Sequence, residues 1–191
     1  MSETFVKGTR MGVDVGSVRV GIALTDPDCV LATPHRTVTR DKNRKKRFDV
    51  KIITGMCEEF HVVTVYVGLP RSLNGQENRS TEMARHYATA LQDRLRSRQC
   101  ETTVRLVDER LSTVAAHQSL LDAGVSRRHH MDKVDQMAAV TFLQSAIDQG
   151  RSTGTEPGFP IDTWIADNGR CSRQNAENIR RPRTTADGDH S

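Results

Sequence analysis

Aromatic residues are scarce in this sequence, because tryptophan, tyrosine and phenylalanine together make up 4% of its 191 residues. Few rings are therefore available to stack on nucleic-acid bases. The 4 cysteines form no C-x-x-C pair and have no clustered histidines beside them. This spacing argues against a zinc site and against a disulfide framework. We interpret the cysteines as free thiols in a reducing compartment.

Long apolar runs are missing as well. The N-terminal residues MSETFVKGTRMGVDVG contain no apolar stretch of the length found in a signal peptide. No other segment approaches the roughly 18 consecutive apolar residues of a membrane-spanning helix. We therefore expect a cytosolic protein that does not associate with a membrane.

The composition suits one globular domain with a tail. Hydrophobic residues make up 36% of the chain, which is enough to build a core in a domain of this size. The formal net charge is +4 and the sequence pI is about 9.1. A mild positive balance favours an anionic partner such as nucleic acid, although it does not define a fold.

Alternation of apolar and small or polar residues over 10–25 predicts a β-hairpin around a Gly-Ser turn. A third short strand is expected near His35–Thr39. From Asp41 the spacing becomes helical, with apolar residues at Phe48, Ile52, Met56 and Phe60.

Two β-branched runs in the centre of the chain, at 61–70 and 102–107, predict strands buried on both faces. Between them, one face of a second helix carries Ala84, Ala88, Leu91 and Leu95. A helix capped by Ser112 should run to Gly124, and a final helix should span about residues 131–148. Strands that alternate with helices predict an α/β fold: a mixed five-stranded sheet flanked by helices.

Three regions follow from these patterns. Residues 1–9 form an N-terminal extension, and residues 10–150 form the α/β domain. Residues 151–191 are polar, contain glycine and proline, and have few apolar residues. We expect them to form a disordered tail, with local docking of the FPIDTWIA piece as the alternative.

Asp14 is the first candidate for chemistry. It lies at the end of the first predicted strand, with Gly12 and Gly16 on its own face. Glycine leaves room for a ligand or another backbone to approach. The alternative is an aspartate that stabilises the hairpin turn.

Asp135 is the second candidate. On the final helix it shares a face with Met131, Ala138, Ala139 and Phe142. Acids are rarely buried on such a face without a partner. The alternative is an acid in the first turn of the helix, favoured by the helix dipole and neutralised by Lys133.

Asp108, Glu109 and Arg110 directly follow the predicted strand at 102–107. Ligands of open α/β sheets bind beyond the carboxyl ends of the strands. This triplet is well placed for a metal and a phosphate, and its alternative is a solvated charge cluster. Spacing alone does not decide between Asp108 and Glu109.

Converging carboxylates repel one another, so a group built from Asp14, Asp135 and one of the acids at 108–109 needs a cation. Oxygen ligands favour Mg²⁺ or Mn²⁺ over zinc. Two such ions roughly 3.5–4 Å apart would activate water and stabilise the leaving oxygen in phosphodiester hydrolysis. The pattern thus favours a metal-dependent nuclease.

Two basic clusters offer phosphate contacts. The run RDKNRKKR at 40–47 is either an electrostatic contact with phosphates or the solvated face of a helix. A second cluster precedes Asp135 and contains Arg127, Arg128 and Lys133. With Arg110, we expect it to line the approach to the acids.

Four segments together resemble the YqgF/RuvX family, the Holliday-junction-resolvase-like proteins also described as pre-16S rRNA nucleases. They are MGVDVGSVRVGIALTD at 11–26, VYVGLPRSLNG at 65–75, VDERLST at 107–113 and KVDQMAAV at 133–140. The resemblance implies an RNase H-like fold and a role in maturing the 5′ end of 16S rRNA during ribosome biogenesis. It assigns the catalytic and metal-binding acids to Asp14, Glu109 and Asp135, with Asp108 in reserve, and it does not extend past Gly150.

Other functions remain open from the sequence. The substrate could be branched DNA, as for a Holliday junction resolvase. The chain could also be a non-catalytic module that binds nucleic acid or the ribosome. The glycine-containing hairpin at 14–21 also resembles that of actin-like phosphotransferases, although those folds need a second domain.

Overall fold

A computed structural model describes residues 3–41, 43, 46–70, 79–108 and 127–162, with side chains of 127–135 excluded. Residues 1–161 form one compact unit. The elements in chain order are β1 (Arg10–Val15), β2 (Arg19–Thr25), β3 (Ala32–Thr39), α1 (Phe48–Glu59), β4 (Thr64–Leu69), α2 (Arg79–Ser97), β5 (Thr103–Asp108), α4 (Arg127–Thr153) and β6 (Phe159–Pro160). The predicted helix between Ser112 and Gly124 lies outside the described residues.

The strands form one mixed sheet in the order β3-β2-β1-β4-β5-β6. β1, β2 and β3 are antiparallel neighbours, whereas β4 is parallel to β1 and β5 is parallel to β4. These pairings confirm the predicted mixed sheet. β6 is a sixth strand that the sequence did not predict, because its two residues are too few to show a period.

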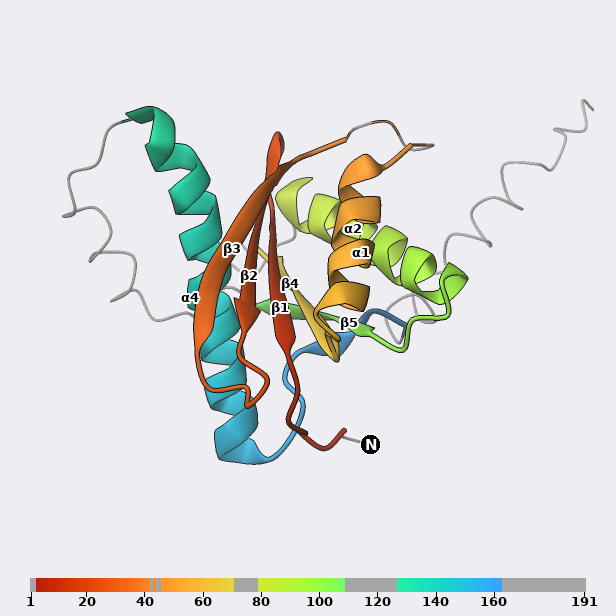
Figure 1. Ribbon diagram of the computed structural model, residues 1–191, viewed down its shortest axis with the longest axis vertical. Helices are drawn as coiled ribbons and strands as arrows, with labels where there is room; N and C mark the ends of the chain where they lie inside the picture. The colour runs from red at the N-terminus through yellow and green to blue at the C-terminus, as the bar shows by residue number, and fades with distance from the viewer. Residues whose placement is uncertain (1–2, 42, 44–45, 71–78, 109–126, 163–191) are drawn as a thin grey trace, which may run out of the picture. The chain divides into compact units, whose positions relative to one another are not determined.

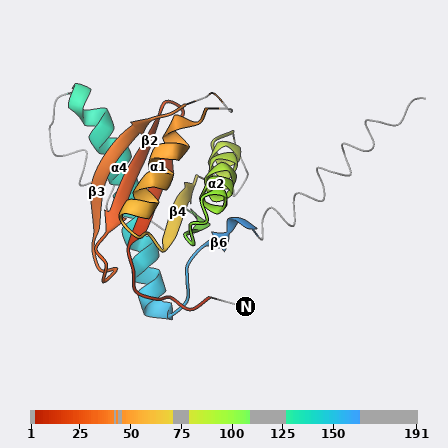
Figure 2. The ribbon, with the colours of Figure 1, turned by 45° about the vertical axis from the view of Figure 1, so that its right-hand side comes forward.

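Helices cover both faces of the sheet (Figure 1). α4 crosses one face and contacts β1, β2 and β3, while α1 and α2 lie on the other face, as the turned view in Figure 2 also shows. The predicted stripe of α2 is buried, as expected, at Ala84, Ala88, Leu91 and Leu95. Within the described residues, no helix combines the length and the apolarity that crossing a bilayer would need.

The helix predicted from Asp41 begins only at Phe48. The Asp41 carboxylate accepts hydrogen bonds from the backbone N–H groups of Asn43 and Phe48, which closes a turn before the helix. Arg47 then adopts a left-handed conformation with φ of 40°. The described residues of the basic run at 40–47 therefore precede α1 and are not part of it, while residues 42, 44 and 45 lie outside the described part.

The apolar stripe predicted for this helix was also partly wrong. Phe48 is 55% exposed and Ile52 is 41% exposed, although Met56 is buried as expected. The helix instead buries a face that includes Val50 and Ile53. The prediction failed because α1 carries two neighbouring apolar stripes, one with Phe48 and Ile52 and one with Val50 and Ile53. Packing against the rest of the domain determines which stripe is buried.

The segment after Gly150 belongs to the folded unit as far as Ile161. α4 continues to Thr153, β6 pairs with β5, and the Ile161 side chain is fully buried. The boundary predicted at 150 was therefore too early, because this segment is anchored by contacts with distant residues. The predicted tail from residue 163 onward lies outside the described residues.

A buried ionic network provides that anchoring. The Tyr66 hydroxyl donates to Glu156 Oε1 over 2.6 Å, and Arg10 Nη2 donates to Glu156 Oε2 over 3.2 Å. Arg105 donates to the carbonyl oxygens of Glu156, Pro157 and Gly158. The segment also binds the N-terminal extension, since Phe5 N–H donates to Gly154 O.

Candidate active site

Asp14 lies near the carboxyl end of β1 and is half-buried. A Cβ atom added to Gly12 would lie 2.9 Å from Leu143 Cβ and 3.0 Å from Ala139 O, so Gly12 faces α4. Alternate residues of a strand share a face. Asp14 is therefore also on the α4 side of the sheet.

One cross-strand row sets the level of α4 relative to Asp14. Asp14 pairs with Gly21 of β2, and Gly21 pairs with Thr37 of β3. Gln136 of α4 donates from Nε2 to Thr37 Oγ1 over 3.1 Å. The part of α4 that contains Asp135 and Gln136 is thus level with the row that contains Asp14.

The position of Asp135 also fits the sheet-facing side of α4. Asp135 lies four residues before Ala139, and positions four apart share a helix face. Ala139 is fully buried and packs with Leu143 against the sheet. The fold therefore places the α4 backbone at Asp135 at the same level of the sheet as Asp14.

Asp108 is the last residue of β5 and is half-buried. Val107 belongs to the cluster with Ala139 on the α4 side. By alternation, Asp108 lies toward the opposite face. Glu109 and Arg110 lie outside the described residues, as do the side chains of Arg127, Arg128, Lys133 and Asp135, whose backbone is in α4.

The donor set fits a hard cation rather than zinc. Asp14, Glu109 and Asp135 would offer only oxygen atoms, which Mg²⁺ and Mn²⁺ prefer. Among the described residues, no three His, Cys, Asp or Glu side chains are grouped closely enough to hold a metal ion. Asp14 is among these described residues, whereas Glu109 and the Asp135 side chain are not.

Two features near this edge of the sheet had no clear sequence signal. Gln136 sets the height of α4, but a single polar residue beside an acid is unremarkable in a sequence. A cavity of about 650 Å³ lies beside the hairpin turn and includes Arg40, Arg47 and Arg79 in its lining. The basic run contained the first two arginines, whereas nothing in the sequence linked Arg79 to them.

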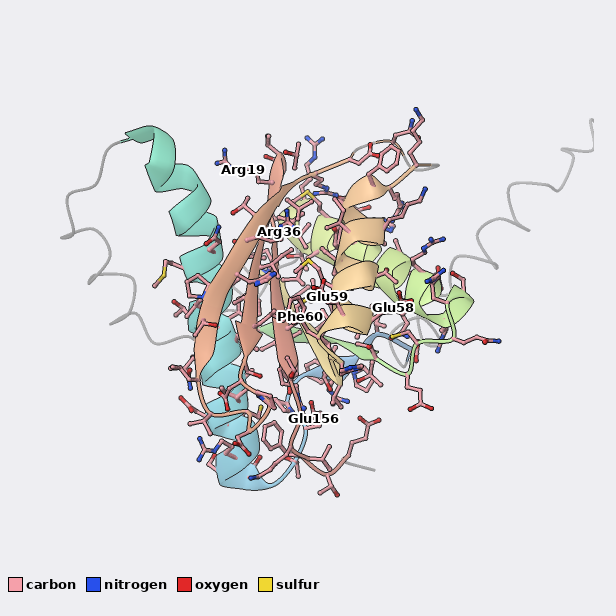
Figure 3. The ribbon with its side chains drawn as sticks, viewed as in Figure 1. Arg19, Arg36, Glu58, Glu59, Phe60 and Glu156 are labelled. Carbon is pink, nitrogen blue, oxygen red and sulfur yellow. The ribbon has the colours of Figure 1, made fainter. Side chains whose placement is uncertain are left out.

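The candidate site and the buried ionic network occupy opposite ends of the sheet. In Figure 3, Arg19 marks the end at the β1–β2 turn and Glu156 marks the other end. Because β1, β4 and β5 are parallel, their carboxyl ends lie at one edge of the sheet, the edge of the β1–β2 turn. Site and anchor are therefore separate parts of the fold.

Comparison with solved structures defines the class of fold. The structure described as "T. thermophilus RuvC in complex with Holliday junction substrate" matches with a TM-score of 0.51. The match covers 78% of this chain and 99% of that chain at 10% sequence identity. At that identity the likeness concerns the fold alone, which is the RNase H-like fold.

Sequence comparison is more specific. Residues 8–149 match the family described as "RuvX: Holliday junction resolvase". A protein of Mycolicibacterium smegmatis named "Putative pre-16S rRNA nuclease" is 44% identical over 146 residues, which are 76% of this chain and 84% of that protein. A protein of the same name from Frankia casuarinae is 45% identical over 149 residues, covering 78% of this chain and 70% of the relative.

The chain belongs to the RuvX family. It is accordingly a nuclease, a hydrolase that acts on ester bonds of nucleic acid. This assignment leaves no support for the actin-like phosphotransferase alternative.

Proposed function

We propose that this protein hydrolyses phosphodiester bonds in the 5′-end processing of precursor 16S rRNA, using divalent metal ions held by Asp14, Glu109 and Asp135. One observation supports this site most directly. Asp14 pairs across the strands with Gly21 and then Thr37, and Thr37 accepts a hydrogen bond from Gln136. This row supports a position of the neighbouring Asp135 at the same height of the sheet as Asp14. The names of the M. smegmatis and F. casuarinae relatives support the substrate.

Glu109 is proposed as the third acid ahead of Asp108. Val107 packs on the α4 side, so alternation along β5 places Asp108 toward the other face of the sheet, away from Asp14. The family resemblance also favours Glu109.

Each part of the site has a distinct task in this proposal. When bound, Mg²⁺ or Mn²⁺ ions would activate a water molecule and stabilise the leaving oxygen. The acids bind and position those ions. Arg110, Arg127, Arg128 and Lys133 hold the phosphates of the substrate on the approach to the acids.

Branched DNA is the second candidate substrate, favoured by the description of the matched family as a Holliday junction resolvase. The two substrates are best compared directly, with cleavage of precursor 16S rRNA and of a four-way DNA junction measured side by side. Faster Mg²⁺-dependent cleavage of the rRNA supports the proposal, and cleavage of the junction alone contradicts it. Binding of the rRNA or of the ribosome without cleavage would indicate a non-catalytic module.

Replacement of Asp14 tests the mechanism. Asp14→Asn preserves the shape of the side chain but removes the charge that attracts the metal. Cleavage should fall by orders of magnitude while substrate binding persists. The matched control is Asp28→Asn, because the Asp28 side chain is 70% exposed and pairs with Lys7 at the surface. Full activity of Asp14→Asn on a substrate cleaved by the parent would contradict the mechanism.

A further inference from the structure

A cavity of about 650 Å³ lies on the face of the sheet opposite α4. Its lining comes from four places: Ser17 in the hairpin turn, Arg40 and Arg47 on either side of the turn before α1, Asp49 of α1, and Arg79 and Tyr87 of α2. The first turns of α1 and α2 both lie toward the hairpin end of the sheet (Figure 1). Three arginines from two segments therefore meet around one hollow.

Arg40 is held in a fixed orientation. Its Nη1 donates to Gly16 O over 2.9 Å, and its guanidinium carbon lies 5.7 Å from the centre of the Tyr87 ring. The side chains of Arg47 and Arg79, by contrast, form no hydrogen bond or ion pair with any residue that the structure describes, and Arg47 bonds there only through its backbone. A guanidinium carries five N–H donors in a planar fork that matches a phosphate group. Two such forks are thus available in the cavity.

The acidic residues of the cavity do not neutralise these arginines through ion pairs. The carboxylate of Asp41 accepts backbone N–H groups, and Glu82 lies 3.4 Å from His86. Asp49 is the remaining acid, and its side chain is buried. The guanidinium groups of Arg47 and Arg79 are therefore not held by the acids of the lining and are available to a ligand.

The buried part of the cavity lining contains Tyr87 and Asp49. Burial and the neighbouring Asp49 carboxylate raise the pKa of the Tyr87 hydroxyl, which keeps it as an O–H donor. The hydroxyl and the Asp49 carboxylate therefore act on each other, and the phosphate contacts are left to the arginines.

The cavity lies close to the candidate active site along the chain. Gly16, which accepts the Arg40 hydrogen bond, follows Asp14 by two residues. Asp14 faces α4, whereas the cavity opens on the side of α1 and α2, so the hairpin turn separates them. A nucleic-acid strand that passes Asp14 could continue around the hairpin turn into the cavity. The short distance along the chain between Asp14 and the cavity would not strengthen the binding of a small anion.

We propose that this cavity binds a backbone phosphate of the nucleic-acid substrate, a few nucleotides from the bond that is cut, through Arg47 and Arg79 with Arg40 beside them. The proposal rests on the nuclease function proposed above and adds a second contact point for the substrate strand. It gives the arginines of the basic run at 40–47 a role in binding that is separate from the acids.

Binding without cleavage tests the proposal. The affinity for a fluorescein-labelled single-stranded RNA is measured by fluorescence anisotropy in EDTA over a series of KCl concentrations. Each lost phosphate contact should reduce the slope of log affinity against log salt by about 0.7. Arg47→Ala/Arg79→Ala removes the contact with this one phosphate and should therefore lower the slope by about 0.7, whereas Arg47→Lys/Arg79→Lys should preserve it because the charges remain.

The control removes two positive charges elsewhere. Lys7 and Arg151 line a different hollow, beside the N-terminal extension, so Lys7→Ala/Arg151→Ala should leave the slope unchanged. An unchanged slope in the Arg47/Arg79 alanine variant, or an equal loss in the control, would overturn the proposal. Tight binding of inorganic phosphate by calorimetry, with no change in the RNA slope, would assign the cavity to a small anion and would also overturn it.

Failure of this inference can be distinguished from failure of the proposed function. If Asp14→Asn abolishes cleavage but the arginine variants keep the parental salt slope, the nuclease assignment stands and the cavity does not bind substrate. If no nucleic acid is cut but the slope falls as expected, the cavity binds nucleic acid in a protein without the proposed activity.

Discussion

Gln136 of α4 donates a hydrogen bond to Thr37 of β3 over 3.1 Å, and this bond joins the helix to the strand row that contains Asp14. A second glutamine of α4 performs a similar task further along the helix, where Gln144 Oε1 accepts the backbone N–H of Ala32 over 2.9 Å. The two bonds fix α4 against β3 at both ends of that strand. The height of Asp135 along the sheet, at the row of Asp14, therefore depends on hydrogen bonds that two glutamine side chains of α4 form with the edge strand β3.

Gln136→Ala should reduce kcat of cleavage several-fold with little change in KM, because α4 loses the bond that sets its level near the acids. The loss in stability should be about 0.5–1.5 kcal/mol, as for a typical hydrogen bond. Gln144→Ala is the matched control, since it removes bonds of the same kind away from Asp14. Steady-state kinetics and urea denaturation of both variants provide the comparison. Equal effects on kcat would show that Gln136 has only a structural role.

Gly12→Ala should destabilise the protein by about 1–3 kcal/mol, because the added Cβ would lie 2.9 Å from Leu143 Cβ and would force α4 away from β1. Cleavage should fall with the displacement of the helix. Gly55→Ala in α1 serves as the control, because a Cβ there meets no atom within 4 Å. That change should stabilise the helix by roughly 0.5–1 kcal/mol. A Gly12→Ala variant with parental stability in urea denaturation would contradict the close packing of α4.

Glu156→Ala should cost about 3–5 kcal/mol of stability, because it leaves the fully buried Arg10 guanidinium without its ionic partner. The control is Glu3→Ala. Glu3 also pairs with a buried arginine, Arg105, but its own side chain is 59% exposed, so water can replace it. Thermal denaturation should show a large drop in Tm for the first variant and a small one for the second. Similar drops would mean that Glu156 does not anchor the segment after α4.

Cys57 should resist alkylation in the native protein. Its burial raises the pKa of the thiol to about 12, so roughly one molecule in ten thousand carries the thiolate at pH 8. Cys100 is only half-buried and should react first with iodoacetamide. Mass spectrometry of digested samples after timed labelling measures both sites, and labelling in urea provides the reference for full exposure. Labelling of native Cys57 as fast as Cys100 would contradict the packing of α1.

The sequence by itself determined the type and order of most elements. Alternating residues predicted the hairpin of β1 and β2, and β-branched runs predicted β4 and β5, because a strand buried on one or both faces must carry that pattern. Asp14 was identifiable as a candidate for a related reason: an acid between glycines in a core strand has no role in packing.

The tertiary structure decided what depends on distant contacts. Which stripe of α1 faces inward, the two-residue strand β6, and the burial of Glu156 against Arg10 and Tyr66 all require partners far away in the chain. The same holds for the level of α4 beside Asp14, because Gln136 and Thr37 are 99 residues apart. Local periodicity reflects only whether a residue is buried, and it contains no information about which distant residue buries it.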